Sequence, residues 1–317
     1  DLKWACEVGA DYVAASFIRT PMNVRSVVAY LDRCIAELGE CSGKPRIRPL
    51  VISKIESKEG VDNFKSILHE SDGIMVARGD LGVEIPYKKV FAAQKDMVSA
   101  CNACGKPVIV ATQMLDSMMR NPRPTRAEVT DVGTAVLDGA DAVMLSGETA
   151  AGKYPIESLK AMKSIVVEAD YIFDAKVNRE RFFDEQRRLK MTSEEEEMDA
   201  VASSAVQSAS DLNAKLIVLI TMSGTVARVV ASHKPTVPVL AFCTDVQVAR
   251  RLQLHRSITP IMLQSTLDPK CKETKMGLLR AEAIRVAREL GYLKGGDRYI
   301  TVDRTAGKDH DMHDFSH

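Results

Sequence analysis

A lysine and a glutamate stand two residues apart at the end of a short apolar run, Ile52–Glu56 (ISKIE). In an extended strand alternate side chains point the same way, so Lys54 and Glu56 project to one side, ~6.6 Å apart along the chain. An ammonium group there could stabilise a phosphoryl group in transfer, and a carboxylate could hold a divalent cation. A Lys–Glu pair at a strand end is also often no more than a salt bridge.

A second carboxylate follows the next apolar run, in Ala77–Gly82 (ARGDLG). Glycines on both sides of Asp80 let the backbone turn sharply, which brings N–H groups and one carboxylate together. Glu56 and Asp80 resemble the ligand set of a hard divalent cation such as Mg²⁺ or Mn²⁺, because two carboxylates leave most coordination positions to water and substrate. By itself, such a turn is a weak signal.

Three further apolar runs also end in polar residues, in Ser16–Arg19 (SFIR), Ala111–Gln113 (ATQ) and Ser146–Thr149 (SGET). Thr112 and the exposed N–H groups of Gly79 and Asp80 could hold a substrate carboxylate. Five runs that deliver polar groups to one rim indicate an active site more strongly than any single pair does.

These residues need a scaffold that brings strand ends together. The five runs are short and rich in Val, Ile and Ala, which is typical of strands buried on both faces of a parallel sheet. They are Tyr12–Phe17, Leu50–Ile55, Gly73–Ala77, Val108–Thr112 and Ala142–Leu145, with helices predicted between them at Asn23–Leu38, Gly60–Glu70, Phe91–Cys104 and Arg126–Leu137. Strand–helix–strand units of about 30 residues form the βαβ pattern, and parallel barrels carry active sites at the carboxyl ends of their strands.

A second, smaller α/β unit is predicted after residue 171, so that the expected domains are 1–171 and 172–317. Thr192 or Ser193 can cap a helix whose first turn, Glu194–Glu197, places acids favourably against the helix dipole. A charged helical connector is predicted at Ile172–Leu189, and strands at Lys215–Thr221, Val237–Cys243, Ile258–Leu263 and Arg298–Val302. The predicted helices are Met198–Asp211, Thr225–Ser232, Val246–Leu254 and Lys275–Leu290.

The overall composition excludes several classes of protein. The 43 basic and 43 acidic residues leave no net charge, which argues against a nucleic-acid binder or a polybasic membrane anchor. The sequence has no apolar run of about 18 residues, and its first residues lack a signal-peptide pattern. Seven cysteines without a tight framework indicate reduced thiols in a cytoplasmic protein.

Two local patterns are interpreted as structural. Cys101–Cys104 is a CxxC without the second pair that a zinc site would need, and it closes a predicted helix rather than opening one. His310, His313 and His317 could bind a metal, but their segment has no apolar period and better fits a mobile tail or surface loop.

The motifs around the strand ends resemble those of pyruvate kinase. The matching segments are Ile52–Glu56 (ISKIE), Asp72–Pro86 (DGIMVARGDLGVEIP), Gly105–Ser117 (GKPVIVATQMLDS), Asn121–Glu128 (NPRPTRAE) and Asp138–Thr149 (DGADAVMLSGET). The resemblance covers essentially the whole chain. It implies Mg²⁺-dependent transfer of phosphate from phosphoenolpyruvate to ADP, giving pyruvate and ATP in the last step of glycolysis.

The resemblance also implies a role for each matching residue. Lys54 would assist phosphoryl transfer, and Glu56 and Asp80 would bind the divalent metal. Ser146 would belong to the network that delivers a proton to enolpyruvate. The group that binds phosphoenolpyruvate would comprise Ala77, Arg78, Gly79, Asp80 and Thr112, with Thr112 also counted among the catalytic residues.

The fold implied by the resemblance is a (β/α)8 TIM barrel, of which the five runs are strands four to eight. The first three strands, the lid domain, an arginine of the site and the K⁺ ligands would lie upstream of Asp1, and a final strand beyond His317. Five strands leave open edges and cannot close a barrel. We therefore expect the chain to be a portion of a longer polypeptide.

The second unit resembles the family's C-terminal regulatory domain. Thr221–Thr225 (TMSGT) leads from a predicted strand into a helix, and hydroxyl and N–H groups at a helix N-terminus suit a phosphate. The resemblance implies a homotetramer and a sugar-phosphate effector, although this loop can also be a plain strand-to-helix turn. The implied effector-binding residues are Thr221, Ser223, Gly224, Thr225 and Arg228.

Two other interpretations stay open at this point. A Mg²⁺-dependent barrel lyase or aldolase acting on pyruvate-like enolates would share the carboxylate pair, but it does not account for Asn121–Glu128, Ser146–Thr149 or the second unit. A non-catalytic fragment or binding module is supported by the missing strands. Dependence of product formation on ADP separates the kinase from the lyase.

Overall fold

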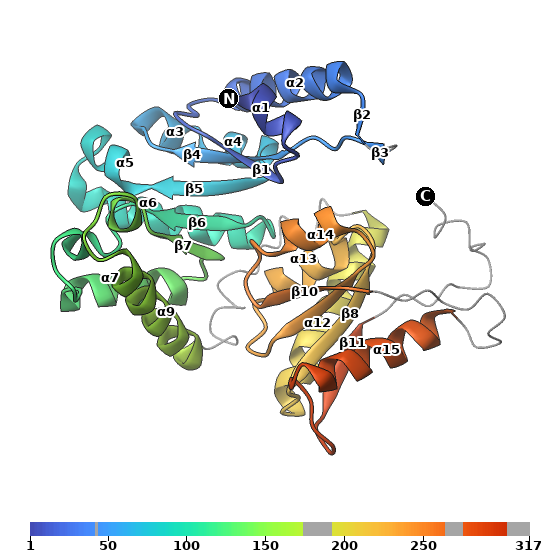
Figure 1. The fold of residues 1–317 in the computed structure, drawn as a ribbon. Helices are drawn as coiled ribbons and strands as arrows, with labels where there is room; N and C mark the ends of the chain where they lie inside the picture. The colour runs from blue at the N-terminus through green and yellow to red at the C-terminus, as the bar shows by residue number, and fades with distance from the viewer. Residues whose placement is uncertain (42–43, 174–191, 264–274, 303–317) are drawn as a thin grey trace. The chain divides into compact units, whose positions relative to one another are not determined.

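The computed structural model describes residues 1–41, 44–173, 192–263 and 275–302 of the chain. The chain divides into two compact units, Asp1–Lys190 with Leu254–Arg256, and Met191–Gln253 with Ser257–His317. The first unit is built on a five-stranded parallel sheet in the order β1-β4-β5-β6-β7 (Figure 1). Its strands are β1 (Tyr12–Ala15), β4 (Leu50–Ile55), β5 (Gly73–Ala77), β6 (Val108–Ala111) and β7 (Ala142–Met144).

Helices connect these strands and pack against the sheet (Figure 1). They are α1 (Leu2–Glu7), α2 (Pro21–Leu38), α3 (Lys58–Asp62), α4 (Phe64–Glu70), α5 (Arg78–Glu84), α6 (Tyr87–Ala103), the 3-10 helix η1 (Asp116–Met119), α7 (Arg126–Leu137), α8 (Gly147–Ala150) and α9 (Pro155–Ile172). A short antiparallel pair, β2 (Glu40–Cys41) and β3 (Lys44–Pro45), follows α2.

Local sequence fixes where the connecting helices begin. The side chain of Thr20 accepts from the backbone N–H of Asn23, and Asn23 bonds back to Thr20, so that α2 starts with a closed capping box and Pro21 in its first turn. Thr125 and Glu128 form the same reciprocal pair at the start of α7. Both helices therefore begin at a defined residue, which fixes the loops between them and the strands that precede them.

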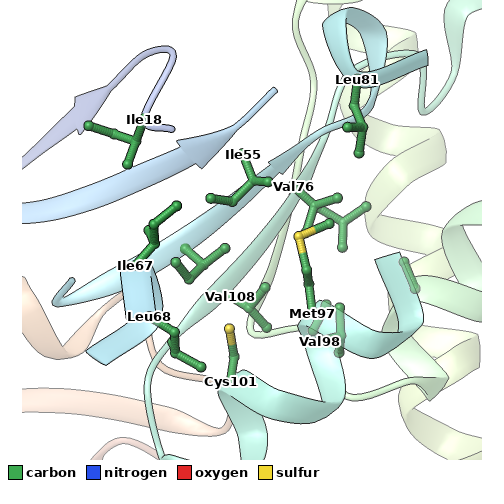
Figure 2. Packing of buried hydrophobic residues seen from close by; sticks show 14 of the residues in the cluster. Ile18, Ile55, Ile67, Leu68, Val76, Leu81, Met97, Val98, Cys101 and Val108 are labelled. Carbon is green, nitrogen blue, oxygen red and sulfur yellow. The ribbon is translucent and has the colours of Figure 1, made fainter. Parts of the chain in front are cut away.

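The central strands β5 and β6 are buried on both faces, as their apolar runs predict, whereas the edge strands β1 and β7 are partly exposed. One side of β4 and β5 contributes Val51, Ile55, Ile74 and Val76 to a large core. Figure 2 shows Ile55 and Val76 in this core with Met97 and Val98 of α6. The other side carries Ile52 and Met75, which pack with Ala111 of β6. Since side chains alternate, Lys54 and Glu56 continue the Ile52 side of β4.

The second unit is a four-stranded parallel sheet in the order β10-β9-β8-β11. Its elements are α12 (Ser193–Asp211), β8 (Leu216–Thr221), α13 (Thr225–Ser232), β9 (Val239–Cys243), α14 (Val246–Leu252), β10 (Ile258–Met262), α15 (Lys275–Glu289) and β11 (Tyr299–Val302). Alternate residues of β8 enter two cores, Ile217 and Leu219 with α12 and α13, and Leu216 and Val218 with α15. The fold class is therefore α/β in both units, as predicted.

The predicted elements match the observed ones closely, with two corrections. The single helix predicted at Gly60–Glu70 is wrong, because the chain breaks at Asn63 into α3 and α4. The sharp turn predicted after β5 is the short helix α5 instead. Thr192 caps α12 through Glu195, as predicted.

Some predicted features lie outside the described residues. They include most of the connector Ile172–Leu189 and the tail with His310, His313 and His317. Among the helices that the structure describes, none has the length and apolar content needed to span a membrane.

Candidate active site

The pair predicted from ISKIE is present at the carboxyl end of β4. The Nζ of Lys54 lies 2.6 Å from Oε1 of Glu56 and donates to Oγ of Ser16, 3.0 Å away, at the end of β1. The Lys54 side chain is 23% exposed, whereas that of Glu56 is 1% exposed. The ammonium group therefore stands between solvent and a fully buried carboxylate.

The second oxygen of Glu56 holds the backbone at the end of β1. Its Oε2 accepts the backbone N–H of Phe17 at 2.6 Å, and Phe17 has the left-handed φ of 53°. A buried carboxylate is stable only when charged or polar groups replace its lost water. Lys54 and the Phe17 amide do this for Glu56.

The second predicted metal ligand, Asp80, follows the neighbouring strand. Strand β5 pairs with β4 in parallel, with Ile55 opposite Val76, so the two strand ends are adjacent. Asp80 is exposed and lies in the first turn of α5, where a negative charge is favourable. Over the described ranges, no group of three or more His, Cys, Asp and Glu side chains is placed to hold a metal. Glu56 and Asp80 thus follow adjacent strands, and carboxylate oxygens are the ligand type that a hard cation takes beside water and substrate oxygens.

Arg78 directs its guanidinium into the protein rather than toward solvent. Nε and Nη2 donate to the carbonyl oxygen of Thr112 at 3.1 and 2.9 Å, and Nη2 also donates to that of Gln113 at 3.1 Å. Nη1 lies 2.8 Å from Oδ1 and 2.7 Å from Oδ2 of Asp131 on α7. Its other contacts are Oε1 of Gln94 on α6 and Sδ of Met114.

Thr112 is held by both neighbouring segments at the end of β6. Its Oγ1 accepts the backbone N–H of Gly79 at 2.7 Å and donates to the carbonyl of Ala111 at 2.6 Å. Thr112 and Gln113 have left-handed φ values of 69° and 55°. The structure thus brings Thr112 and Gly79 together as predicted, but it commits the Gly79 N–H to Thr112.

Ser146, at the end of β7, has a buried hydroxyl without a hydrogen-bond partner in the described part of the chain. Its backbone N–H donates to Oε2 of Glu148 at 2.8 Å, and Oε1 of Glu148 accepts the N–H of Leu115 at 2.9 Å. Buried hydroxyls are usually paired, so the free Oγ of Ser146 is suited to a water or substrate atom. Glu148 is 2% exposed and fastens the loops after β6 and β7 to each other.

Sequence reasoning missed the residues that support this site. Two of them, Gln94 and Asp131, lie inside helices and not at a strand end. Glu148 lies in the segment SGET, but its residue type does not show which groups it binds. Only the folded structure shows which loops these side chains hold. The carboxylate of Glu128 in NPRPTRAE is also structural: it accepts from the backbone N–H and hydroxyl groups of Ser117 and Thr125. Burial acts to raise the pKa of Glu128, but these four hydrogen bonds outweigh it and lower the pKa below the ordinary value.

The loop predicted to bind an effector leads from β8 into α13. Gly224 has φ 79° and its N–H donates to Oγ1 of Thr221 at 2.9 Å. Arg228 folds back onto the loop, with Nη1 donating to the Ser223 carbonyl at 3.2 Å and Nη2 to Oγ1 of Thr225 at 3.0 Å. The five predicted residues therefore lie in one loop and the first turn of α13.

Known proteins resemble this chain over nearly its full length. Residues 1–159 match the family described as pyruvate kinase, barrel domain, and residues 199–315 match pyruvate kinase, alpha/beta domain. The chain belongs to the pyruvate kinase family. It is 46% identical over 267 residues to a pyruvate kinase of Dictyostelium discoideum, covering 84% of this chain and 50% of the relative. It is 42% identical over 308 residues to that of Leishmania mexicana, covering 95% and 57%.

The fold agrees with a solved member of the family. A crystal structure of a pyruvate kinase from Cryptosporidium parvum superposes with a TM-score of 0.83 at 39% identity, covering 95% of this chain and 58% of that one. The five-stranded sheet of the first unit accordingly belongs to the family's barrel domain, and the four-stranded sheet to its α/β domain. The chain spans 50% and 57% of the two relatives named above.

Proposed function

We propose that the protein carrying this chain transfers a phosphoryl group from phosphoenolpyruvate to ADP, yielding pyruvate and ATP. The observation that carries the proposal is the Lys54–Glu56 pair at the carboxyl end of β4, with its ammonium group partly open to solvent. Family membership supports it, because both family segments occur in order along the chain. The same membership weighs against a lyase or aldolase, which would have no use for the second unit.

In the proposed reaction, a divalent cation held by Glu56 and Asp80 would neutralise charge on the phosphoryl oxygens. The ammonium group of Lys54 stabilises the charge that spreads over the same oxygens in the transition state. Thr112 and the start of α5, from Ala77 to Asp80, orient the substrate carboxylate. We assign Ser146, whose hydroxyl has no hydrogen-bond partner among the described residues, to the network that supplies a proton to the enolate carbon.

The other partners are proposed from the family resemblance. K⁺ is proposed as a further cation, with its ligands outside this chain. The assembly is proposed to be a homotetramer acting in the cytoplasm. We keep the predicted division into a catalytic domain at 1–171 and a regulatory domain at 172–317 as part of the same proposal.

The first experiment measures pyruvate release from phosphoenolpyruvate with ADP and Mg²⁺. Lys54→Met is expected to lower the rate by about 10²-fold or more, the effect of losing one electrostatic stabiliser, and Glu56→Gln to raise the Mg²⁺ requirement. The matched control is Lys58→Met, since Lys58 also pairs with a carboxylate, Asp62, but on the exposed surface of α3.

Two results would refute the kinase proposal, and two others would refute the role of a single residue. Pyruvate release that does not need ADP would support the lyase, and a folded protein without activity would support a binding module. A Lys54→Met variant as active as Lys58→Met would remove Lys54 from the mechanism. Unchanged metal dependence in Glu56→Gln would remove Glu56 as a ligand.

We also propose that the loop Thr221–Thr225 binds a phosphate group of a sugar-phosphate effector. The support is local: the hydroxyl groups of Ser223 and Thr225 lie 2.9 Å apart, and Thr225 Oγ1 accepts from the guanidinium of Arg228. Arg228→Gln is expected to weaken activation by sugar phosphates at least tenfold. Arg285→Gln serves as the control, because Arg285 is an exposed arginine that pairs with Glu289 on α15. Equal activation of both variants would exclude the site.

A further inference from the structure

The guanidinium of Arg78 joins its own helix, α5, to three other segments of the first unit. It bonds to the loop after β6 through two carbonyl oxygens, to α6 through Gln94 and to α7 through Asp131. The Arg78 side chain is 11% exposed. All of its nitrogen atoms therefore have partners inside the protein, and none of these partners is a substrate.

The two carbonyl groups that Arg78 holds belong to residues in an unfavourable conformation. Thr112 and Gln113 have left-handed φ values of 69° and 55°, which non-glycine residues rarely adopt. A planar guanidinium with a fixed fork of donors restrains two successive carbonyls better than a single donor could. Arg78 is thus the group that keeps the Thr112 hydroxyl where it meets the Gly79 N–H, 2.7 Å away.

Arg78 in turn needs a counter-charge, because a largely buried cation is costly without one. Asp131 supplies it, with both carboxylate oxygens within 2.8 Å of Nη1. Gln94 is a neutral acceptor at the longer distance of 3.3 Å. In the described part of the chain, Asp131 is the one carboxylate that forms an ion pair with Arg78.

We propose that Asp131 is a positioning residue for the substrate-binding turn. It fixes the Arg78 guanidinium, which holds the Thr112 and Gln113 carbonyls, and Thr112 in turn holds the Gly79 N–H in the first turn of α5. Asp131 itself belongs to α7 and acts on substrate only through this chain of contacts. The consequence for substrate affinity rests on the proposed function, whereas the consequence for the Gly79–Thr112 hydrogen bond does not.

The test compares Asp131→Ala with a matched control at the end of the same helix, α7. Asp138 is the C-cap of α7 and pairs with Lys95 of α6 at 2.6 Å, so Asp138→Ala also breaks an ion pair between α6 and α7. Among the described residues, the hydrogen bonds of the Lys95 ammonium group go to Asp138 and not to Thr112. Asp131→Ala is expected to raise the KM for phosphoenolpyruvate at least tenfold with less than a threefold change in kcat, and Asp138→Ala to change neither.

A second readout follows the turn directly. Hydrogen exchange of peptides that contain Gly79 and Thr112, measured by mass spectrometry, is expected to be at least tenfold faster at the Gly79 amide in Asp131→Ala than in wild type. Asp138→Ala is expected to leave it unchanged. Asp131→Glu keeps the charge and is expected to restore most of the protection and most of the affinity, and Asp131→Asn takes the place of the alanine variant if that does not fold.

The outcomes separate the two proposals. If wild type makes no pyruvate, the proposed function fails, and the exchange rates alone decide whether Asp131 positions the turn. If wild type is active and Asp131→Ala has an unchanged KM and an unchanged Gly79 exchange rate, the positioning role is overturned. Equal effects of Asp131→Ala and Asp138→Ala would also overturn it, because they would show a general loss of packing between the helices.

Discussion

Lys54 and Glu56 should contribute unequally to stability although they form one ion pair. The Glu56 side chain is 1% exposed and that of Lys54 is 23% exposed, so only the lysine can regain water when its partner is removed. Lys54→Met leaves a buried carboxylate with the Phe17 amide as its remaining compensation. Breaking a buried pair in this way costs about 3–5 kcal/mol, and we expect about 3 kcal/mol here.

The reverse change is milder. Glu56→Gln keeps an oxygen that can accept the Phe17 N–H, and the Lys54 ammonium can turn toward solvent, so a loss of about 1 kcal/mol is expected. Combining both changes removes the charge and its partner together. The double variant should therefore be about 1–2 kcal/mol more stable than Lys54→Met alone.

The assay is urea denaturation without divalent cations, followed by far-UV circular dichroism. The one tryptophan of the sequence, Trp4 on α1, is 65% exposed, so its emission is a poor probe of the transition. With a slope of about 2 kcal/mol per molar urea, 3 kcal/mol moves the midpoint by about 1.5 M. A Glu56→Gln variant less stable than Lys54→Met, or a double variant no more stable than Lys54→Met, would refute the reasoning.

Three further predictions concern stability. Hydrogen bonds hold the folded pKa of Glu128 below its ordinary value of 4.5. The ionised Glu128 therefore adds to the free energy of unfolding above that pH, and this contribution is lost as the pH falls through the folded pKa. Wild type should lose its stability advantage over Glu128→Gln in acid, and a difference in unfolding free energy that does not change with pH would contradict this. Gly73→Ala should cost about 1–3 kcal/mol, since a Cβ would lie 2.6 Å from Ile52 Cδ1 and 3.0 Å from the Pro107 carbonyl. Gly133→Ala should raise the free energy of unfolding by about 0.5–1 kcal/mol, because Gly133 lies in the middle of α7 and a Cβ there would meet no atom within 4 Å. Equal urea midpoints for the Gly73→Ala and Gly133→Ala variants would contradict both predictions.

The strands were predictable because buried parallel strands have a strong local signature. Leu50–Ile55 and Gly73–Ala77 are predicted with the same ends that the structure has. Each is a short and mostly apolar run, and most residues on both faces of these two strands are buried in the fold. Lys54 and Glu56 could be placed on one side for the same reason, since alternation in a strand is a local property.

The errors arise where tertiary contacts decide the local structure. The helix predicted at Gly60–Glu70 breaks at Asn63, whose side-chain amide donates to the Arg19 carbonyl at 3.0 Å, far away in sequence. Helix α5 forms despite two glycines, which disfavour helices. Leu81 is fully buried there and the Gly79 N–H is bound by Thr112, so packing and one hydrogen bond replace the missing propensity.

The conformation of the site itself depends on the charged residues that the sequence assigns to chemistry. Phe17, Thr112 and Gln113 are left-handed, at a cost of about 1–3 kcal/mol each, and nothing in their residue types predicts it. Glu56 holds the first by its amide, and Arg78 holds the other two by their carbonyls. Loss of activity in a variant of Glu56 or Arg78 therefore does not by itself identify a catalytic role. Glu56→Gln removes the charge but keeps an oxygen for the Phe17 hydrogen bond. This variant therefore distinguishes a role of Glu56 in the reaction from its role in holding the backbone.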